Sequence, residues 1–195
     1  MSSVSVGQPA PSFRLPSGQG SEIGNEDYRG KKNTIVWFTK GFSCPFCRQH
    51  MSQLARGYSR FRDLDTELLE IAVTTPPRAR SYLQKFQLPY PYLCDPDYDV
   101  RKRWGLGVRS HSLLWYAKSI YQGFSAPTPE NDFGSFGPPI PEMPRTLADD
   151  DAGFFIVDKG GTVRFAQSGA YAGAEGVQPI PNNDQIVREL EKLRG

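Results

Sequence analysis

Residues 34–47 read TIVWFTKGFSCPFC. The apolar, β-branched start predicts a buried strand over residues 33–39, and Gly41 marks the turn after it. Beyond the turn, apolar residues recur at helical spacing, which predicts a helix over residues 45–62. A strand that delivers a cysteine to the first turn of a helix favours a reactive thiolate. This stretch therefore predicts thiol chemistry.

The turn places Cys44 at the N-terminus of the predicted helix. If Cys44 is the N-cap, Pro45 falls at the first helical position, where its missing N–H and fixed φ are well tolerated. Cys47 is then the third helical residue, and its backbone N–H is directed at the Cys44 sulfur. This amide, the helix dipole and the charges of Lys40 and Arg48 favour a thiolate. We expect the pKa of Cys44 to lie below its free value of about 8.5.

The second cysteine belongs to the apolar side of the predicted helix. Cys47 shares a helical line with Met51, Leu54 and Tyr58, at spacings of four, three and four. This line predicts that Cys47 is more buried than Cys44. An exposed attacking thiol beside a shielded resolving thiol is the arrangement that dithiol–disulfide exchange requires.

Other interpretations of the cysteine pair are open. Half of a zinc site needs a partner pair, and the remaining candidates, Cys94, His50 and His111, stand at no zinc-site spacing. Copper(I) is a second possibility, because Cys44, Cys47 and His50 follow one another at three-residue intervals. The two cysteines could also be inert. The strand–turn–helix setting favours redox use over these alternatives.

Composition narrows the function classes. The 195 residues suffice for a single domain over residues 1–195, and 23 basic residues nearly balance 21 acidic ones. That balance argues against a nucleic-acid or membrane-surface partner. No run approaches the roughly 18 apolar residues of a transmembrane helix, and residues 1–7 lack the features of a signal peptide. Three cysteines do not make a disulfide scaffold. We therefore expect a cytoplasmic protein without a membrane segment.

The rest of the chain alternates between strand and helix patterns. Residues 1–32 read as an extended segment, suited to an edge or a clasp, with one helical turn at 25–30. We further expect strands at 67–73, 91–94, 153–158 and 162–166, helices at 76–87 and 98–104, and a hairpin turn at 159–161. Asn182, Asn183 or Asp184 can cap a final helix. Such alternation implies βαβ units with parallel strands.

Residues 109–151 interrupt this alternation of strands and helices. A helical pattern at 109–122 is followed by six prolines between residues 125 and 144 and by little periodicity. A structureless loop of this length is usually functional or mobile. We interpret 109–151 as an insertion that forms a lid or faces a partner, with plain decoration as the alternative.

Four short motifs carry a family resemblance. They are GQPAPSF at 7–13, WF and CPFCR at 37–38 and 44–48, LCDPD at 93–97, and FIVDKGG at 155–161. With these motifs the chain resembles the peroxiredoxin-like branch of the AhpC/TSA family, within the thioredoxin fold. The resemblance implies an α/β, thioredoxin-like fold with a central mixed sheet flanked by helices. In this fold the helical, Pro-rich insertion at 109–151 comes before the last hairpin. It also implies that the reactive cysteine begins the helix after the first core strand.

The chain departs from the usual family pattern around the attacking cysteine. Peroxidases of this family have Pro-x-x-x-Thr/Ser-x-x-Cys, but here Trp37 and Gly41 take the Pro and Thr/Ser positions. Thr39 or Ser43 could supply the hydroxyl instead. Ala152 stands where such peroxidases have an arginine and thioredoxins a cis-proline. A guanidinium could come from elsewhere, the candidates being Arg78, Arg80, Arg101, Arg103, Arg109 and Arg145.

The predicted site is built around the two cysteines. Cys44 and Cys47 are the predicted catalytic residues. The predicted substrate pocket consists of their neighbours in the turn and one residue of a later strand: Thr39, Gly41, Phe42, Ser43, Phe46 and Ala152. Phe42 and Phe46 form an apolar rim for substrate or pack in the core. Cys94 is an alternative resolving thiol, although a free cysteine is more often a small buried apolar residue.

We expect a peroxiredoxin-like thiol–disulfide oxidoreductase. Cys44 attacks a disulfide or a peroxide, and Cys47 resolves the product as a Cys44–Cys47 disulfide. A dithiol of the thioredoxin or glutathione system restores the pair, and no metal or organic cofactor is required. A dedicated thiol peroxidase is the alternative within this class. Alternatives of another class are metal handling and a redox-inert interaction domain that uses residues 125–144. The oligomeric state is left open.

Overall fold

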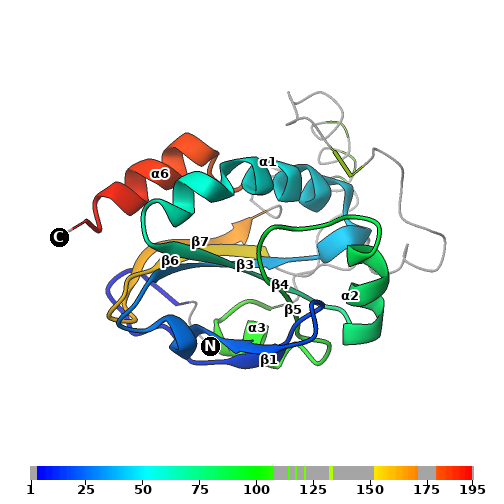
Figure 1. Ribbon diagram of the computed structural model, residues 1–195, viewed down its shortest axis with the longest axis horizontal. Coiled ribbons are helices and arrows are strands. Elements are labelled where there is room, and N and C mark those ends of the chain that lie inside the picture. Colours follow the sequence, from blue (N-terminus) through cyan, green and yellow to red (C-terminus); the bar gives the residue numbers. More distant parts are fainter. Residues whose placement is uncertain are drawn as a thin grey trace.

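The computed structural model describes residues 4–107, 114, 117, 121, 132–133, 152–170 and 179–194. Within these residues a five-stranded sheet has the strand order β5-β4-β3-β6-β7. The strands are β3 (Asn33–Thr39), β4 (Thr66–Ala72), β5 (Tyr92–Cys94), β6 (Ala152–Val157) and β7 (Val163–Ala170). β4 is parallel to β3 and β5, whereas β6 is antiparallel to β3 and β7. The predicted mixed sheet is confirmed, with β3 at its centre (Figure 1).

Helices flank the sheet on both faces. α1 (Pro45–Arg62) and α6 (Asn183–Glu191) lie side by side on one face (Figure 1). Asn183 Nδ2 donates to the Gln53 carbonyl oxygen at 2.7 Å, and a Cβ on Gly57 would stand 2.5 Å from the Asn183 side chain. α3 (Asp99–Arg103) lies on the opposite face, and α2 (Pro76–Leu83) stands near the β5 edge (Figure 1).

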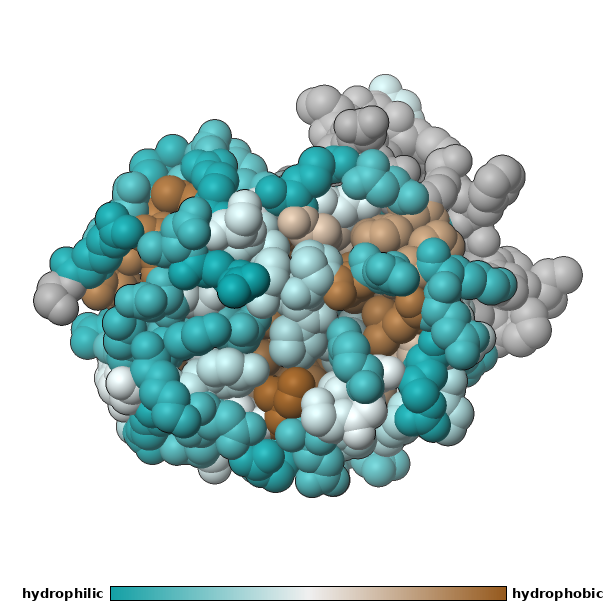
Figure 2. Space-filling model, viewed as in Figure 1, coloured by the Kyte–Doolittle hydropathy of each residue, from teal (hydrophilic) through white to brown (hydrophobic). Residues whose placement is uncertain are grey.

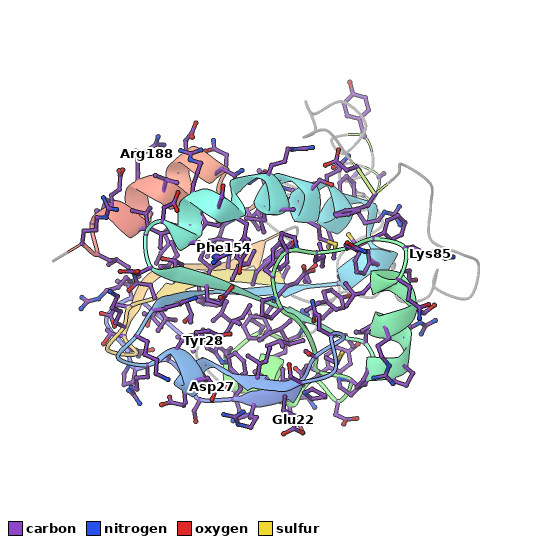
Figure 3. The ribbon with its side chains drawn as sticks, in the orientation of Figure 1. Glu22, Asp27, Tyr28, Lys85, Phe154 and Arg188 are labelled. Atoms are coloured by element: carbon purple, nitrogen blue, oxygen red, sulfur yellow. The ribbon has the colours of Figure 1, made fainter. Side chains whose placement is uncertain are left out.

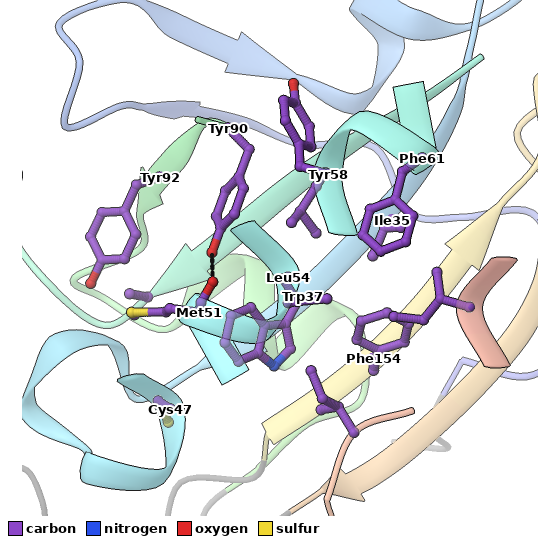
Figure 4. Close-up of a cluster of buried hydrophobic side chains, with 14 of the residues drawn as sticks. Ile35, Trp37, Cys47, Met51, Leu54, Tyr58, Phe61, Tyr90, Tyr92 and Phe154 are labelled. Atoms are coloured by element: carbon purple, nitrogen blue, oxygen red, sulfur yellow. Dashed lines mark hydrogen bonds between the residues drawn. The ribbon is translucent and has the colours of Figure 1, made fainter. Parts of the chain in front are cut away.

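The alternation of side chains along β3 divides the interior into two layers. Ile35 and Trp37 face α1 and α6, whereas Val36 and Phe38 face α3 and the N-terminal strands. Figure 4 shows the first layer, and Figure 3 shows Phe154 of β6 pointing into it. Because β3 is buried on both faces, its sequence reads as a nearly continuous apolar run.

The N-terminal segment forms a small hairpin under the second layer. β1 (Arg14–Pro16) pairs antiparallel with β2 (Glu22–Gly24), and the helical turn η1 (Asn25–Tyr28) follows. Pro9 forms a bridge with Thr162, so the segment also clasps the turn between β6 and β7. The sequence predicted the clasp and the helical turn. It missed the hairpin, because the two strands are only three residues long and the first ends in a proline.

Most other predicted elements lie close to their observed bounds. α1 has the predicted bounds, and Asn182 caps the last helix. α2 ends earlier than predicted, at Leu83. The reason is that the Tyr82 carbonyl accepts the N–H of both Lys85 and Phe86, at 2.9 Å each, which tightens the chain into a turn.

The region predicted as an insertion lies largely outside the described residues. This applies to the helix at 109–122, of which only positions 114, 117 and 121 are described and helical, and to the Pro-rich segment 125–144, apart from positions 132 and 133. The single domain and the role of residues 109–151 therefore stay predictions. None of the helices in the described ranges combines the length and the apolar character needed to cross a membrane.

Candidate active site

The turn between β3 and α1 requires a glycine. β3 ends at Thr39, and the short turn η2 (Gly41–Ser43) leads into α1. Gly41 has φ +71°, and a Cβ there would stand 2.3 Å from the Tyr92 hydroxyl and 3.1 Å from Ala72 Cβ. Both the backbone conformation and the nearby Tyr92 hydroxyl disfavour a larger residue. The hydroxyl that the resemblance expects at this position is therefore absent for a structural reason.

Cys44 caps α1 with its side chain. Its backbone is extended, Pro45 is the first helical residue, and the Cys47 N–H donates to Cys44 Sγ at 3.4 Å. The Arg48 N–H donates to the Cys44 carbonyl oxygen at 3.1 Å. The positive end of the helix thus meets one sulfur atom. The predicted N-cap geometry is confirmed.

This environment lowers the pKa of Cys44 to about 7. The hydrogen bond with the Cys47 thiol is the largest cause of the lowered pKa, and the charge of Lys40 and the backbone N–H groups of Cys47 and Phe46 add to it. Burial opposes the shift, because it disfavours the charged form. At neutral pH about half of Cys44 is therefore ionised.

Cys47 is perturbed in the opposite direction. Burial, followed by the hydrogen bond and the charge of Cys44, raises the pKa of Cys47 well above its ordinary value. The Thr39 hydroxyl accepts the Gly41 N–H at 3.1 Å and also hydrogen-bonds to Cys47. The pair therefore keeps the proton on Cys47 and the negative charge on Cys44.

The two thiols differ less in exposure than the sequence predicted. Cys47 is fully buried and Cys44 is 5% exposed, so the predicted order of burial is confirmed. The prediction that Cys44 is an exposed thiol is wrong. The N-cap geometry that directs its sulfur back to the Cys47 amide also turns that sulfur away from solvent.

Arg48 is the buried guanidinium on the Cys44 side of the turn. Arg48 Nη1 donates to the Phe42 carbonyl oxygen at 3.0 Å, which folds the side chain back over η2. Burial lowers the pKa of Arg48, and the negative charge of Cys44 counteracts this. The two charges therefore attract each other across the first turn of the helix.

Arg101, one of the predicted alternative arginines, holds the end of β3 from the other face. Its Nη2 donates to the Thr39 carbonyl oxygen at 2.7 Å, and its guanidinium lies 5.8 Å from the centre of the Phe38 ring. The Asp95 carboxylate accepts the Arg101 N–H at 3.0 Å. Because Phe38 belongs to the layer opposite the cysteines, Arg101 positions the strand rather than the sulfur atoms.

The other predicted arginines are spread over the molecule. Arg103 Nη1 donates to the Ser12 carbonyl oxygen at 2.8 Å, and Arg78 and Arg80 lie in α2. Arg109 and Arg145 lie outside the described residues.

Ala152 flanks the end of the central strand. Phe38 pairs with Gly153, so Ala152, the preceding residue of β6, lies next to Thr39. Ala152 is buried in the same layer as the two cysteines. The structure therefore brings Thr39 and Ala152 to the site, whereas the side chain of Ser43 lies outside the described part of the chain.

Aromatic side chains surround the turn. The Phe42 ring stacks on Tyr82, with ring centres 5.0 Å apart, and contacts Phe86, Tyr92 and Phe133 as well. Phe42 is 2% exposed, which makes it a core residue rather than an open rim. Partly buried apolar residues around it, namely Phe46, Leu83, Phe86, Leu88 and Phe133, pack against the same layer. Figure 2 shows apolar surface gathered over α2 and the start of α1.

Two further candidates from the sequence, Cys94 and His50, are both buried. Cys94, at the end of β5, is fully buried, and burial raises its pKa to about 11. A neutral buried thiol fits the small apolar role. The His50 ring nitrogen Nδ1 lies 2.8 Å from the Phe46 carbonyl oxygen, and burial lowers the pKa of His50. Across the described ranges, no three His, Cys, Asp or Glu residues are grouped as metal ligands would be.

Sequence reasoning missed Glu70. This residue is fully buried in β4, between Leu68 and Ala72, which both face α1. Burial raises the pKa of Glu70 well above its ordinary value. The available signal was an acidic residue at an inward position of the run LLEIA, where an apolar residue is expected.

Comparison with known sequences gives consistent matches. The sequence model of the AhpC/TSA family matches residues 6–166. The chloroplastic peroxiredoxin Q of Populus jackii is 27% identical over 103 residues, which are 53% of this chain and 48% of that protein. The putative peroxiredoxin bcp of Haemophilus influenzae is 30% identical over 106 residues, which are 54% of this chain and 68% of that protein. The chain thus spans about half the length of the plant relative.

Solved structures match nearly the whole chain. The crystal structure of peroxidoxin BcpB from Mycobacterium tuberculosis has a TM-score of 0.66 and 14% identity, and the match covers 97% of this chain and 98% of that one. The reduced 2-Cys peroxiredoxin of Plasmodium vivax has a TM-score of 0.63 and 15% identity, with 95% and 80% coverage. These matches show that the fold is the predicted thioredoxin-like one.

Proposed function

Because the chain belongs to the AhpC/TSA family, we propose that it is a peroxiredoxin-like thiol–disulfide oxidoreductase that works through a reversible Cys44–Cys47 disulfide. One observation carries the proposal. The thiol and the amide of Cys47 both hydrogen-bond to the Cys44 sulfur, and the pKa of Cys44 falls to about 7. A thiolate at neutral pH beside a protonated thiol is suited to disulfide exchange.

With a disulfide substrate, the Cys44 thiolate attacks one sulfur and forms a mixed disulfide, and the other substrate sulfur leaves as a thiolate. Cys47 then loses its proton and attacks the Cys44 sulfur. The second substrate sulfur leaves with a proton, and the Cys44–Cys47 disulfide remains. Arg48 and Lys40 stabilise the negative charge of Cys44 before the attack.

With a peroxide substrate, the Cys44 thiolate attacks one peroxide oxygen and becomes a sulfenic acid, while the O–O bond breaks and the other oxygen leaves as an alcohol or water. Cys47 attacks the sulfenic sulfur and releases water. A dedicated thiol peroxidase is the second candidate, because the curated relatives are named peroxiredoxins. The glycine at 41 and the alanine at 152 favour broader thiol–disulfide chemistry.

The partners follow from this chemistry. A dithiol of the thioredoxin or glutathione system reduces the Cys44–Cys47 disulfide. The substrate is a disulfide or a hydroperoxide, and the cycle uses no metal or organic cofactor. A cytoplasmic location, where such reductants are abundant, completes the proposal.

The proposal is tested by steady-state assays with three substrates: hydrogen peroxide, an alkyl hydroperoxide and a protein disulfide. Each is assayed once with thioredoxin and its reductase and once with glutathione and its reductase. We expect turnover with the disulfide and slower turnover with at least one peroxide. Turnover of peroxides alone would support the dedicated peroxidase, and no turnover with any pair would contradict the proposal.

Single cysteine variants separate the two roles. Cys44→Ser is expected to lose all turnover. Cys47→Ser should instead accumulate a mixed disulfide or an over-oxidised Cys44, detected by mass spectrometry. Cys94→Ser is the matched control and should keep its turnover, because Cys94 is a neutral thiol with a pKa of about 11. A dead Cys47→Ser beside an active Cys44→Ser would reverse the assigned roles.

A further inference from the structure

The segments around the redox pair carry positive charge only. Residues 39–50 and 71–94, which include the β3–α1 turn and α2, contain no Asp or Glu. Their basic residues are Lys40, Arg48, Arg78, Arg80 and Lys85. Because the whole chain has 23 basic and 21 acidic residues, this excess of positive charge is local.

The same segments present apolar side chains at the surface. Five of them pack against the core and stay partly exposed, and we call them the apolar patch: Phe46, Leu83, Phe86, Leu88 and Phe133. The centre of the Phe86 ring lies 5.7 Å from that of Phe42 and 5.5 Å from that of Phe133. Since Phe42 stands two residues before Cys44, the patch is continuous with the turn that holds the reactive thiol.

Basic side chains accompany the patch. Arg80 on α2 and Lys85 just beyond it are exposed, whereas Lys40 and Arg78 are partly exposed, and we call these four residues the basic rim. Figure 3 shows Lys85 on the outside of the molecule next to α2, and Figure 2 shows hydrophilic side chains bordering the apolar surface.

Two acidic residues close to these segments are already engaged. Asp132 forms an ion pair with Arg56 of α1 at 2.6 Å, and its N–H donates to the Ser52 hydroxyl at 3.1 Å. The Asp95 carboxylate accepts the first N–H groups of α3, on the opposite face of the sheet. The positive charge of the rim is therefore available to a partner.

The small opening above Cys44 calls for a partner that is held in place. Cys44 is only 5% exposed, so a substrate sulfur reaches it only in a narrow range of positions. Contacts away from the reacting atoms supply such positioning. A small polar substrate would leave the apolar patch in water. An aromatic centre with a charged border instead has the make-up of a protein interface, and opposite charges steer the encounter.

We propose that the apolar patch and the basic rim form the docking surface for a polypeptide substrate whose disulfide lies in an apolar segment flanked by Asp or Glu. The proposal rests on the disulfide exchange of the proposed function. Cys44 attacks one substrate sulfur, the substrate S–S bond breaks, and its electron pair goes to the other sulfur. Cys47 then displaces the first sulfur and forms the Cys44–Cys47 disulfide. The substrate leaves as a dithiol, with one proton from Cys47 and one from water.

Three synthetic peptides with one internal disulfide test the charge preference. They share two leucines between the cysteines and differ in their flanks, which are Glu, Gln or Lys. Reduced protein is mixed with each peptide at low and at high salt, and the Cys44–Cys47 disulfide is followed by rapid quench and mass spectrometry. Each rate is divided by the rate of the same peptide with dithiothreitol, which removes differences in intrinsic reactivity. We expect the Glu peptide to react at least about tenfold faster than the Lys peptide at low salt, and the ratio to fall toward one at high salt.

Charge reversal locates the surface. Arg80→Glu combined with Lys85→Glu should abolish or invert the preference for the Glu peptide. The matched control is Lys159→Glu combined with Lys192→Glu, which changes the net charge equally at the β6–β7 turn and at the end of α6, far from α2 (Figure 1). The control should keep the preference. Equal losses in both variants would overturn the docking surface, because only the net charge of the protein would then matter.

Further measurements separate docking from folding and from thiol reactivity. Both charge-reversed variants should unfold in urea like the parent and react with iodoacetamide, which is small and uncharged, within about threefold of the parent rate. A Glu-flanked peptide with serines in place of the leucines should react at least about threefold more slowly at high salt, because it lacks the apolar contact. An equal rate for this peptide would contradict a role for the apolar patch.

The outcomes for the two proposals differ. Equal rates for the Glu, Gln and Lys peptides would overturn the docking surface while leaving the disulfide exchange intact. No Cys44–Cys47 disulfide with any peptide would instead overturn the proposed function, and this proposal with it.

Discussion

At the scale of single residues, the chemistry depends on the unequal pair Cys44 and Cys47. Both sit in one helical turn and both are buried, yet their pKa values move in opposite directions. The difference arises because hydrogen bonds converge on the Cys44 sulfur, whereas burial dominates at Cys47. At neutral pH such a pair has one nucleophilic thiolate, Cys44, and one protonated thiol, Cys47.

Alkylation kinetics should reveal this difference. Because the pKa of Cys44 is about 7, the rate of its reaction with iodoacetamide is expected to rise with a midpoint near pH 7. Mass spectrometry should place the first label on Cys44. In Cys47→Ala, the loss of the thiol hydrogen bond should move the midpoint to higher pH. A midpoint near the free value of about 8.5 in the intact protein would contradict the assignment.

Gly41 is the residue where the family pattern and the local geometry conflict. We expect Gly41→Ser to lower the free energy of unfolding by more than about 1 kcal/mol through its left-handed backbone, with a further loss from the clash with Tyr92. It should not raise the rate of peroxide reduction. Gly30→Ser is the matched control, because Gly30 has a similar φ of +74° but open space around it. Equal losses in both variants, by urea denaturation, would show that the Tyr92 contact is unimportant.

Glu70 should make stability depend on pH. The pKa of Glu70 in the folded state is raised above the ordinary value of 4.5. The contribution of Glu70 to the free energy of unfolding is therefore fully present below pH 4.5. The contribution is lost as the pH rises toward the folded-state pKa. The free energy of unfolding of Glu70→Gln should therefore gain on that of the parent as the pH rises from 4.5 to 8. A constant difference across this range would show that Glu70 is ionised in the folded protein.

At the scale of elements, the site depends on where β3 ends and α1 begins. Arg101 of α3 holds the Thr39 carbonyl on one face, and the Thr39 hydroxyl contacts the Gly41 amide and Cys47 on the other. α6 packs on α1 at a distance from the cysteines, through the contact of Asn183 with Gln53. The packing of α6 on α1 therefore contributes stability, whereas the β3–α1 turn and the first turn of α1 carry the chemistry.

The cap of α6 provides a test of this division. The Asn182 side chain accepts the Gln185 N–H at 2.9 Å, and the Gln185 side chain accepts the Asn182 N–H at 2.8 Å. Asn182→Ala is expected to cost about 1 kcal/mol of the free energy of unfolding, and Asn182→Ser much less. Neither variant should move the alkylation midpoint of Cys44. A shifted midpoint in a folded Asn182→Ala would show that α6 does tune the site.

At the scale of the whole molecule, the sequence predicted the sheet, the flanking helices and the N-cap turn. These elements have strong local signals: a β-branched run, a proline at the first helical position and apolar residues at helical spacing. The β1–β2 hairpin was missed because its strands are too short to show a period. The burial of Cys44 and the place of Glu70 were missed because both depend on contacts between segments that are distant in sequence.

The most direct test of the account is the redox state of the cysteines after limited oxidation. The reduced protein is treated with one equivalent of hydrogen peroxide or of a disulfide reagent, free thiols are blocked, and the peptide that contains both cysteines is analysed by mass spectrometry. The account predicts that this peptide loses two hydrogens and takes up no label, while Cys94 is labelled after unfolding. Free thiols on both Cys44 and Cys47, or a disulfide that includes Cys94, would contradict it.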